Sequence, residues 1–220
     1  MFEALVEDFK AEFRKNLVTV IKFGTEAEPD NVLFVFHEIN PVVLLTIRKI
    51  LKKHRSNMPV VPLFFTKKEI LEGADVFPLD YLDIKYPHQL LYGADVINQI
   101  KFDKQAIRHQ LEFEVRSKLI HLREHYIWMK SHDELRALLW STLPSILPLL
   151  YGLLYLKNIE PPDEFEFLYS SIKDEFNLNV TILKKMKQLK KVSDAELHVF
   201  VKEIMNFLTE LSEIVDKIRA

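Results

Sequence analysis

The chain has 220 residues, of which 48% are apolar and 28% charged, with a formal net charge of −2. This is an ordinary globular composition, long enough for one domain or two small ones, and the absence of cysteine excludes disulfides and thiolate metal sites. Lysine and arginine number 13 against 15 acidic residues up to Asp103, and 17 against 17 after it, so neither part indicates a nucleic-acid surface.

The first hundred residues combine helical and strand patterns. A capping box at Thr66–Glu69, a proline at the start of a helix and a glycine at the end of another mark several boundaries. Pro62 favours an edge position for its strand. The pattern predicts a helix, two strands, a helix, a strand, a short helix and a strand, at residues 2–15, 17–23, 31–36, 41–54, 60–65, 66–73 and 79–86.

After Asp103 the pattern is helical throughout. A continuous apolar stripe predicts a long helix over 104–130, and a capping box at Ser131 begins the next, which Pro144 and Pro148 should kink or interrupt. Three further helices are expected near Asp163, at 180–189 and from Ser193 onwards. We therefore expect an α+β protein with a small mixed sheet at 1–103 and an all-α bundle of about five helices at 104–220.

Three stretches carry a resemblance to a known family. They are Val18-Thr-Val-Ile-Lys-Phe-Gly-Thr25, Asp30-Asn-Val-Leu-Phe-Val-Phe36, and residues 76–85 with Leu91-Tyr-Gly-Ala-Asp95. Together they resemble the bacterial nucleotidyltransferase superfamily, of the type with a polymerase-β-like domain followed by a helical bundle. The resemblance implies that Gly24 and Thr25 hold a phosphate, that Asp30 binds a metal, and that an active member would use Mg²⁺ and a nucleoside triphosphate.

The chain departs from that pattern at the residues that carry the chemistry. The second carboxylate of the metal site falls on Val32, no third carboxylate occurs in 60–65, and Glu26 and Glu28 place negative charge in the phosphate loop. A single acid does not hold two Mg²⁺ ions. We therefore expect a catalytically impaired protein with no assigned catalytic residue and no cofactor, which retains a ligand-binding or partner-binding role. The alternative is an active nucleotidyltransferase that acts on a small molecule.

Two motifs overlap on the helix over 104–130. His121, Glu124 and His125 match an inverted zinc-peptidase motif, and Arg116 with His121 matches the ribonuclease motif of HEPN domains, a further alternative function. Both matches are short, and charges at i,i+4 spacing favour a solvated, salt-bridged helix face instead.

Self-association is expected through the helical half, where Tyr126, Trp128, Met129 and Trp140 supply residue types that are favoured at interfaces. The N-terminus is acidic and amphipathic, unlike a signal peptide, and the apolar run 138–156 contains two prolines. We expect this run to be a buried helix rather than a membrane span, and the protein to be cytoplasmic.

Overall fold

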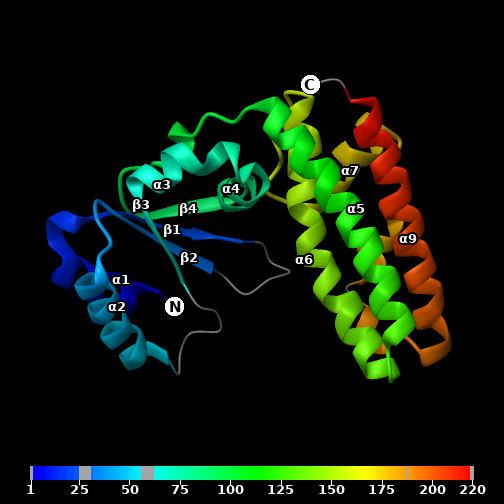
Figure 1. Ribbon diagram of the computed structural model, residues 1–220, viewed down its shortest axis with the longest axis horizontal. Helices are drawn as coiled ribbons and strands as arrows, with labels where there is room; N and C mark the ends of the chain where they lie inside the picture. The colour runs from blue at the N-terminus through cyan, green and yellow to red at the C-terminus, as the bar shows by residue number, and fades with distance from the viewer. Residues whose placement is uncertain (1, 25–30, 56–61, 187, 219–220) are drawn as a thin grey trace. The chain divides into compact units, whose positions relative to one another are not determined.

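A computed structural model describes residues 2–24, 31–55, 62–186 and 188–218 (Figure 1). The chain consists of two compact units, Met1–Phe102 and Asp103–Ala220. The fold is α+β, as expected, because a four-stranded mixed sheet lies in the first unit and only helices follow it.

The sheet of the first unit has the strand order β3-β2-β1-β4, in which β2 and β3 are parallel and the other pairs antiparallel. The strands are β1 (Leu17–Phe23), β2 (Asn31–Phe36), β3 (Leu63–Thr66) and β4 (His88–Gly93). The helices are α1 (Glu3–Phe13), α2 (Pro41–His54), α3 (Lys67–Glu72) and α4 (Pro78–Lys85), with short 3-10 turns η1 (Arg14–Asn16), η3 (Gly73–Asp75) and η4 (Ile97–Gln99). The strands expected at 17–23 and 31–36 and the helix at 41–54 are confirmed.

Both faces of the sheet are covered by helices (Figure 1). On β2, Val32, Phe34 and Phe36 face the layer of α1 and α2, and Leu33 and Val35 join the cluster that includes α3 and α4. All five side chains have no exposed surface. A strand buried on both faces is an uninterrupted apolar run rather than an alternating one, and this explains the sequence of β2.

The expected strand at 79–86 is wrong, because these residues lie mostly in the helix α4. Pro78 occupies the first helical turn, where its missing N–H costs nothing, and the helix buries Leu79, Leu82 and Ile84. The fourth strand is β4, which follows directly and pairs with β1. The apolar residues that alternate in this segment therefore belong to a short helix that is buried on several sides.

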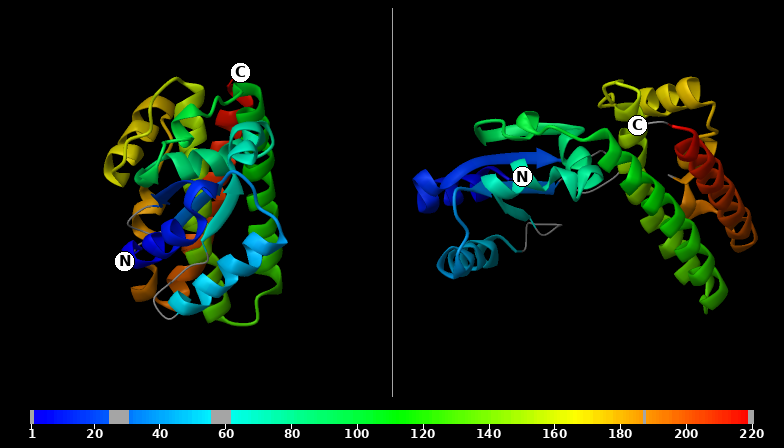
Figure 2. Two further views of the ribbon diagram at one scale, coloured as in Figure 1. Left: turned by 90° about the vertical axis from the view of Figure 1, so that its left-hand side faces the viewer. Right: turned by 45° about the horizontal axis from the view of Figure 1, so that its top comes forward.

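The second unit contains five α-helices in its described part: α5 (Lys104–Trp128), α6 (His132–Leu156), α7 (Phe165–Phe176), α8 (Thr181–Met186) and α9 (Asp194–Lys217). The long helices α5, α6 and α9 lie side by side (Figures 1 and 2). Ile107, Leu111, Val115 and Leu122 form the buried stripe of α5, and the capping box at Ser193 that begins α9 is present. Helix α6 continues through Pro144 and Pro148 without interruption.

Helix α6 is long and apolar enough to cross a membrane, and 53% of its most apolar window is buried inside the protein. The core helix of a soluble protein has these same properties, so one such helix among the described residues is weak evidence for a membrane span. A soluble protein is consistent with this finding.

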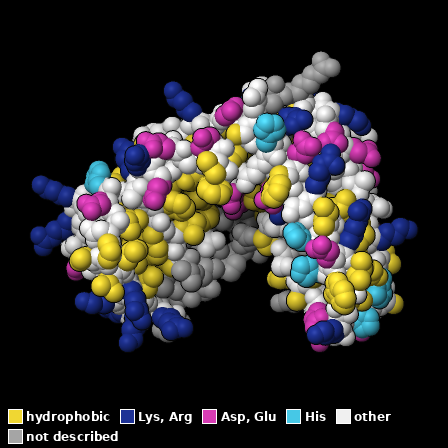
Figure 3. Space-filling model, viewed as in Figure 1, with side chains coloured by type: hydrophobic (Ala, Val, Ile, Leu, Met, Phe, Trp, Pro, Cys, Tyr) yellow, Lys and Arg dark blue, Asp and Glu magenta, His cyan; other side chains and the backbone are white. Residues whose placement is uncertain are grey.

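Large apolar side chains are also exposed on the surface of both units (Figure 3). In the first unit they include Val42, Leu44 and Leu45 in the early turns of α2, whose last turn is cationic. In the second unit they are most frequent on α5.

Candidate functional site

The turn that the resemblance assigns to a phosphate begins at the end of β1. Gly24 follows Phe23 directly and has φ 104°, a backbone conformation that glycine adopts without strain. Thr25 and Asp30, the other two candidate residues of this turn, lie outside the described residues. Only the conformation of Gly24 itself is described, and the phosphate-binding role of this segment stays a prediction.

Val32 stands where the resemblance would place a second metal ligand, and the structure places it in the apolar core. Its side chain has no exposed surface and belongs to a cluster with Phe2, Val6 and Phe34. A carboxylate at this position would be surrounded by apolar side chains and not by solvent or a metal. In the parts of the chain that the structure describes, no three His, Asp or Glu side chains are grouped so as to hold a metal ion.

The Leu-Tyr-Gly stretch followed by an acid has an identifiable structural role. Gly93 ends β4 with φ 80°, and a Cβ atom at this residue would lie 2.0 Å from the carbonyl oxygen of Val18 on β1. Only glycine allows this close approach of the two backbones. Thr19 fixes the same strand pair, because its hydroxyl donates a 2.7 Å hydrogen bond to the carbonyl oxygen of Tyr92.

Asp95 holds the turn that follows β4. Its Oδ1 accepts a hydrogen bond from the Asn98 backbone N–H at 3.1 Å, and its Oδ2 lies 3.1 Å from His88 Nε2. The other ring nitrogen of His88 lies 2.8 Å from the carbonyl oxygen of Lys85. Burial raises the pKa of Asp95, but the hydrogen bonds from Asn98 and His88 outweigh burial, so this pKa lies below its ordinary value of 3.8. The acid of this motif therefore stabilises a local structure.

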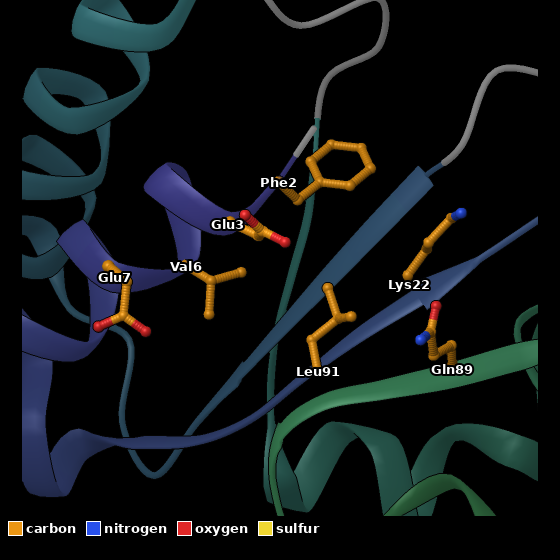
Figure 4. Close-up of a pocket in the computed structure, with 7 residues that line it drawn as sticks. All are labelled: Phe2, Glu3, Val6, Glu7, Lys22, Gln89 and Leu91. Carbon is orange, nitrogen blue, oxygen red and sulfur yellow. The ribbon is translucent and has the colours of Figure 1, made fainter.

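A pocket of about 310 Å³ lies between α1 and the sheet, close to the end of β1 (Figure 4). Leu91 of β4, together with Phe2 and Val6, gives it apolar walls. Lys22 of β1 and Gln89 of β4 are paired in the strand register and lie side by side in Figure 4. The pocket is lined by Phe2, Glu3, Val6, Glu7, Lys22, Gln89 and Leu91.

The charges of this pocket are on different elements. Helix α1 contributes the carboxylates of Glu3 and Glu7, and β1 contributes the ammonium of Lys22. Glu7 also pairs with Lys10 at 2.6 Å. Such a site can bind an anionic group at Lys22 and hydrogen-bond donors at the carboxylates, with apolar surface between them.

Lys22 was not among the residues that we expected at a site. One signal in the sequence points to it, because it is the single charged residue in the strand Leu17–Phe23. Its two neighbours, Ile21 and Phe23, belong to the core on the opposite face of the sheet. A lysine in the middle of a sheet is costly unless its ammonium reaches solvent or a partner. The pocket that α1 forms over β1 and β4 is where this side chain lies.

The two overlapping motifs of α5 lie on an exposed surface. Arg116 pairs with Asp216 at 2.9 Å and with Glu112 at 3.5 Å, so its guanidinium is already bound by carboxylates. His121 lies five residues further along the helix, about 140° around its axis, and pairs with Glu124. The structure therefore does not bring Arg116 and His121 together in one pocket.

His121 and His125 share one side of α5, with ring centroids 6.5 Å apart. The Nδ1 of His125 donates a 2.8 Å hydrogen bond to the carbonyl oxygen of His121, and Glu124 is the partner of His121. These contacts agree with a solvated helix face. The absence of zinc from this place stays a prediction.

The residues expected at an interface differ in exposure. Trp128 is 80% exposed and Trp140 46%, whereas Tyr126 is half-buried and its hydroxyl lies 2.8 Å from His198 Nδ1 on α9.

Comparison of the chain with protein-family models found no matching family, and a comparison with curated proteins found no match either.

Proposed function

We propose that this protein is a nucleotidyltransferase-like protein that has lost nucleotidyl transfer and binds a small polar ligand in the pocket around Lys22. The burial of Val32 is the observation that carries the loss of transfer, because in-line displacement at a nucleoside triphosphate needs carboxylates that hold Mg²⁺. The protein acts, in this proposal, as a soluble cytoplasmic binding protein.

The lining of the pocket supports a ligand that carries both an anionic group and hydrogen-bond donors. Among the seven residues that line the pocket, Lys22 is the only cationic one, and Glu3 and Glu7 are the two acidic ones. A nucleoside triphosphate would bring several negative charges close to these two carboxylates, and their repulsion disfavours it. A zwitterionic molecule, such as an amino acid or an amino-sugar phosphate, can place its anionic group at Lys22 and its cationic group at Glu3 and Glu7.

The test is a thermal-shift screen of amino acids, amino sugars and their phosphates. A ligand of the zwitterionic class should raise the melting temperature of the wild type, because a ligand that binds only the folded state stabilises it. Lys22→Met should abolish this increase. Lys15→Met is the matched control, since Lys15 is exposed and does not line the pocket, and its response should equal that of the wild type. A ligand response that survives in Lys22→Met would contradict the proposal.

Calorimetry with Mg·ATP, Mg·CTP and Mg·GTP separates this proposal from an active nucleotidyltransferase. We expect no magnesium-dependent heat of binding at micromolar nucleotide. A magnesium-dependent signal that Asp30→Ala removes would contradict the expected absence of nucleotide binding and favour the enzymatic alternative.

A further inference from the structure

The outward face of α5 carries an apolar stripe that its own chain leaves exposed. Phe113, Ile120 and Ile127 are 68%, 52% and 74% exposed, and Trp128 beside them is 80% exposed. The opposite side of the same helix is the buried stripe of Ile107, Leu111, Val115 and Leu122. Four large apolar side chains on one solvent-facing side of a helix indicate an interaction surface rather than scattered surface residues.

The spacing of this stripe is that of a helix which packs along another helix. Phe113, Ile120 and Ile127 follow one another at intervals of seven residues. Residues seven apart on an α-helix drift by only about 20° around the axis, so they form a nearly straight seam along it. A seam of this kind packs against a second helix at a shallow crossing angle.

We propose that this seam binds a second copy of the chain, with the two α5 helices side by side and parallel. Phe113, Ile120 and Ile127 then each meet the same residue of the partner across a two-fold axis that runs along the helices. An interface with two-fold symmetry needs a self-complementary surface, and an apolar seam with opposite charges on its two sides has that property.

The charges beside the seam select the parallel arrangement. On a helical wheel, Arg116 and Arg123 lie on one side of Ile120, and Ser117 and Glu124 lie on the other. In a parallel pair, opposite sides of the two seams meet, so Arg123 of each copy faces the partner's Glu124. In an antiparallel pair, like sides meet, so Arg123 would face the partner's Arg116, which Glu112 and Asp216 already bind, and would not meet Glu124.

The neighbours of these two residues leave room for such a pair. Among the described residues, no carboxylate lies within ion-pair distance of Arg123 in its own chain. The side chain of Glu124 is 59% exposed and has His121 as its partner at 3.0 Å. A carboxylate can accept bonds from both His121 and an arginine, because it has two oxygen atoms.

The length of the seam indicates how stable the dimer is. From Phe113 to Trp128 it extends over about 23 Å of helix. A single seam of this length covers less area than the roughly 2,000 Å² or more that permanent dimers bury. We therefore expect a reversible dimer, whose fraction rises with protein concentration. This proposal is independent of the ligand pocket, which lies in the first unit.

Cysteine cross-linking tests the seam and its direction, because the chain has no cysteine of its own. Three variants, Phe113→Cys, Ile120→Cys and Ile127→Cys, each provide one thiol for a short bismaleimide linker. All three should yield a product of twice the 26.0 kDa chain mass. Phe167→Cys on α7 is the matched control, because Phe167 is 61% exposed and lies outside the seam, and it should stay monomeric.

The set of cross-linked products distinguishes a parallel pair, an antiparallel pair and the absence of a dimer through this seam. Cross-linking of Ile120→Cys alone, together with a mixed product of Phe113→Cys and Ile127→Cys, would show an antiparallel pair and overturn the parallel arrangement. Products no more abundant than that of Phe167→Cys would overturn the proposal as a whole. Circular dichroism of each variant verifies that it is folded.

Sedimentation equilibrium provides a second readout on the otherwise unaltered chain. Ile120→Glu places two carboxylates opposite each other in the seam and should weaken dimerisation by about 100-fold or more. Phe167→Glu makes the same kind of change elsewhere and should leave the equilibrium unchanged. A wild-type protein that stays monomeric at high micromolar concentration would overturn the proposal.

Discussion

Val32 of β2 packs among Phe2, Val6 and Phe34, between the sheet and the layer of α1 and α2. The shape and apolarity of this side chain suit the core, where a carboxylate would be an unpaired buried charge. The apolar residue at position 32 is therefore explained by the packing of the first unit.

We predict that Val32→Asp destabilises the protein and does not restore a metal site. The free energy of unfolding should fall by at least about 3 kcal/mol, because the carboxylate is buried without a partner. Val32→Ala is the control for lost packing alone, with an expected loss of about 2 kcal/mol. Urea denaturation measures both values, with and without Mg²⁺. A Val32→Asp protein that Mg²⁺ stabilises would show that this position still belongs to a metal site.

At the scale of single elements, the segment from β4 to η4 contains the Leu91-Tyr-Gly-Ala-Asp95 stretch, and its residues have a structural role. Gly93 lets β4 approach β1, and Asp95 binds the backbone of η4 and the ring of His88. These contacts join the edge strand to the turn that precedes the second unit. The hydrogen-bonded carboxylate also makes the stability of this segment depend on pH.

We predict that the stability difference between wild type and Asp95→Asn decreases in acid. The pKa of Asp95 is lowered in the folded state, so its ionised form stabilises the fold fully above the ordinary value of 3.8. This contribution is lost as the pH falls through the lower folded-state pKa. Urea denaturation of both proteins between pH 7 and pH 3 measures the difference. A difference that stays constant over this range would contradict the role given to the ionised carboxylate.

At the scale of the whole molecule, the two units have separate apolar interiors. The clusters on the two faces of the sheet contain only residues of the first unit, and the buried stripe of α9 packs on helices of the second. Units with separate cores can unfold in separate transitions, and a core mutation then affects the transition of its own unit.

We predict two calorimetric transitions that respond to different mutations. Leu211→Ala, at a fully buried position of α9, should lower the stability of the second unit by about 2–5 kcal/mol. Val20→Ala, at a fully buried position of β1, should shift only the other transition. Differential scanning calorimetry measures both. If each substitution moves every transition equally, the two units unfold as one cooperative body and the prediction is wrong.

Local signals in the sequence predicted most elements of this protein to within a few residues of their observed bounds. The helix at 41–54 is an example, because Asn40 caps its first N–H groups and Pro41 fixes its first turn. The strand at 31–36 is recognisable from an unbroken apolar run, and α5 and α9 from stripes at helical spacing. These signals act within one element, so they can be recognised without knowledge of its neighbours.

Other features depend on contacts between distant segments, and only the tertiary structure decided them. The segment at 79–86 is a helix because packing against the sheet buries several of its sides at once, which removed the periodicity that distinguishes a helix from a strand. The pocket at Lys22 needs β4 beside β1 and α1 above both, although residues 3, 22 and 89 are far apart in the chain. The sequence by itself determined most helices, most strands and the apolar residue at position 32, because composition and local spacing suffice for these. The burial of Val32 and the position of Lys22 follow from long-range packing, which no local pattern specifies.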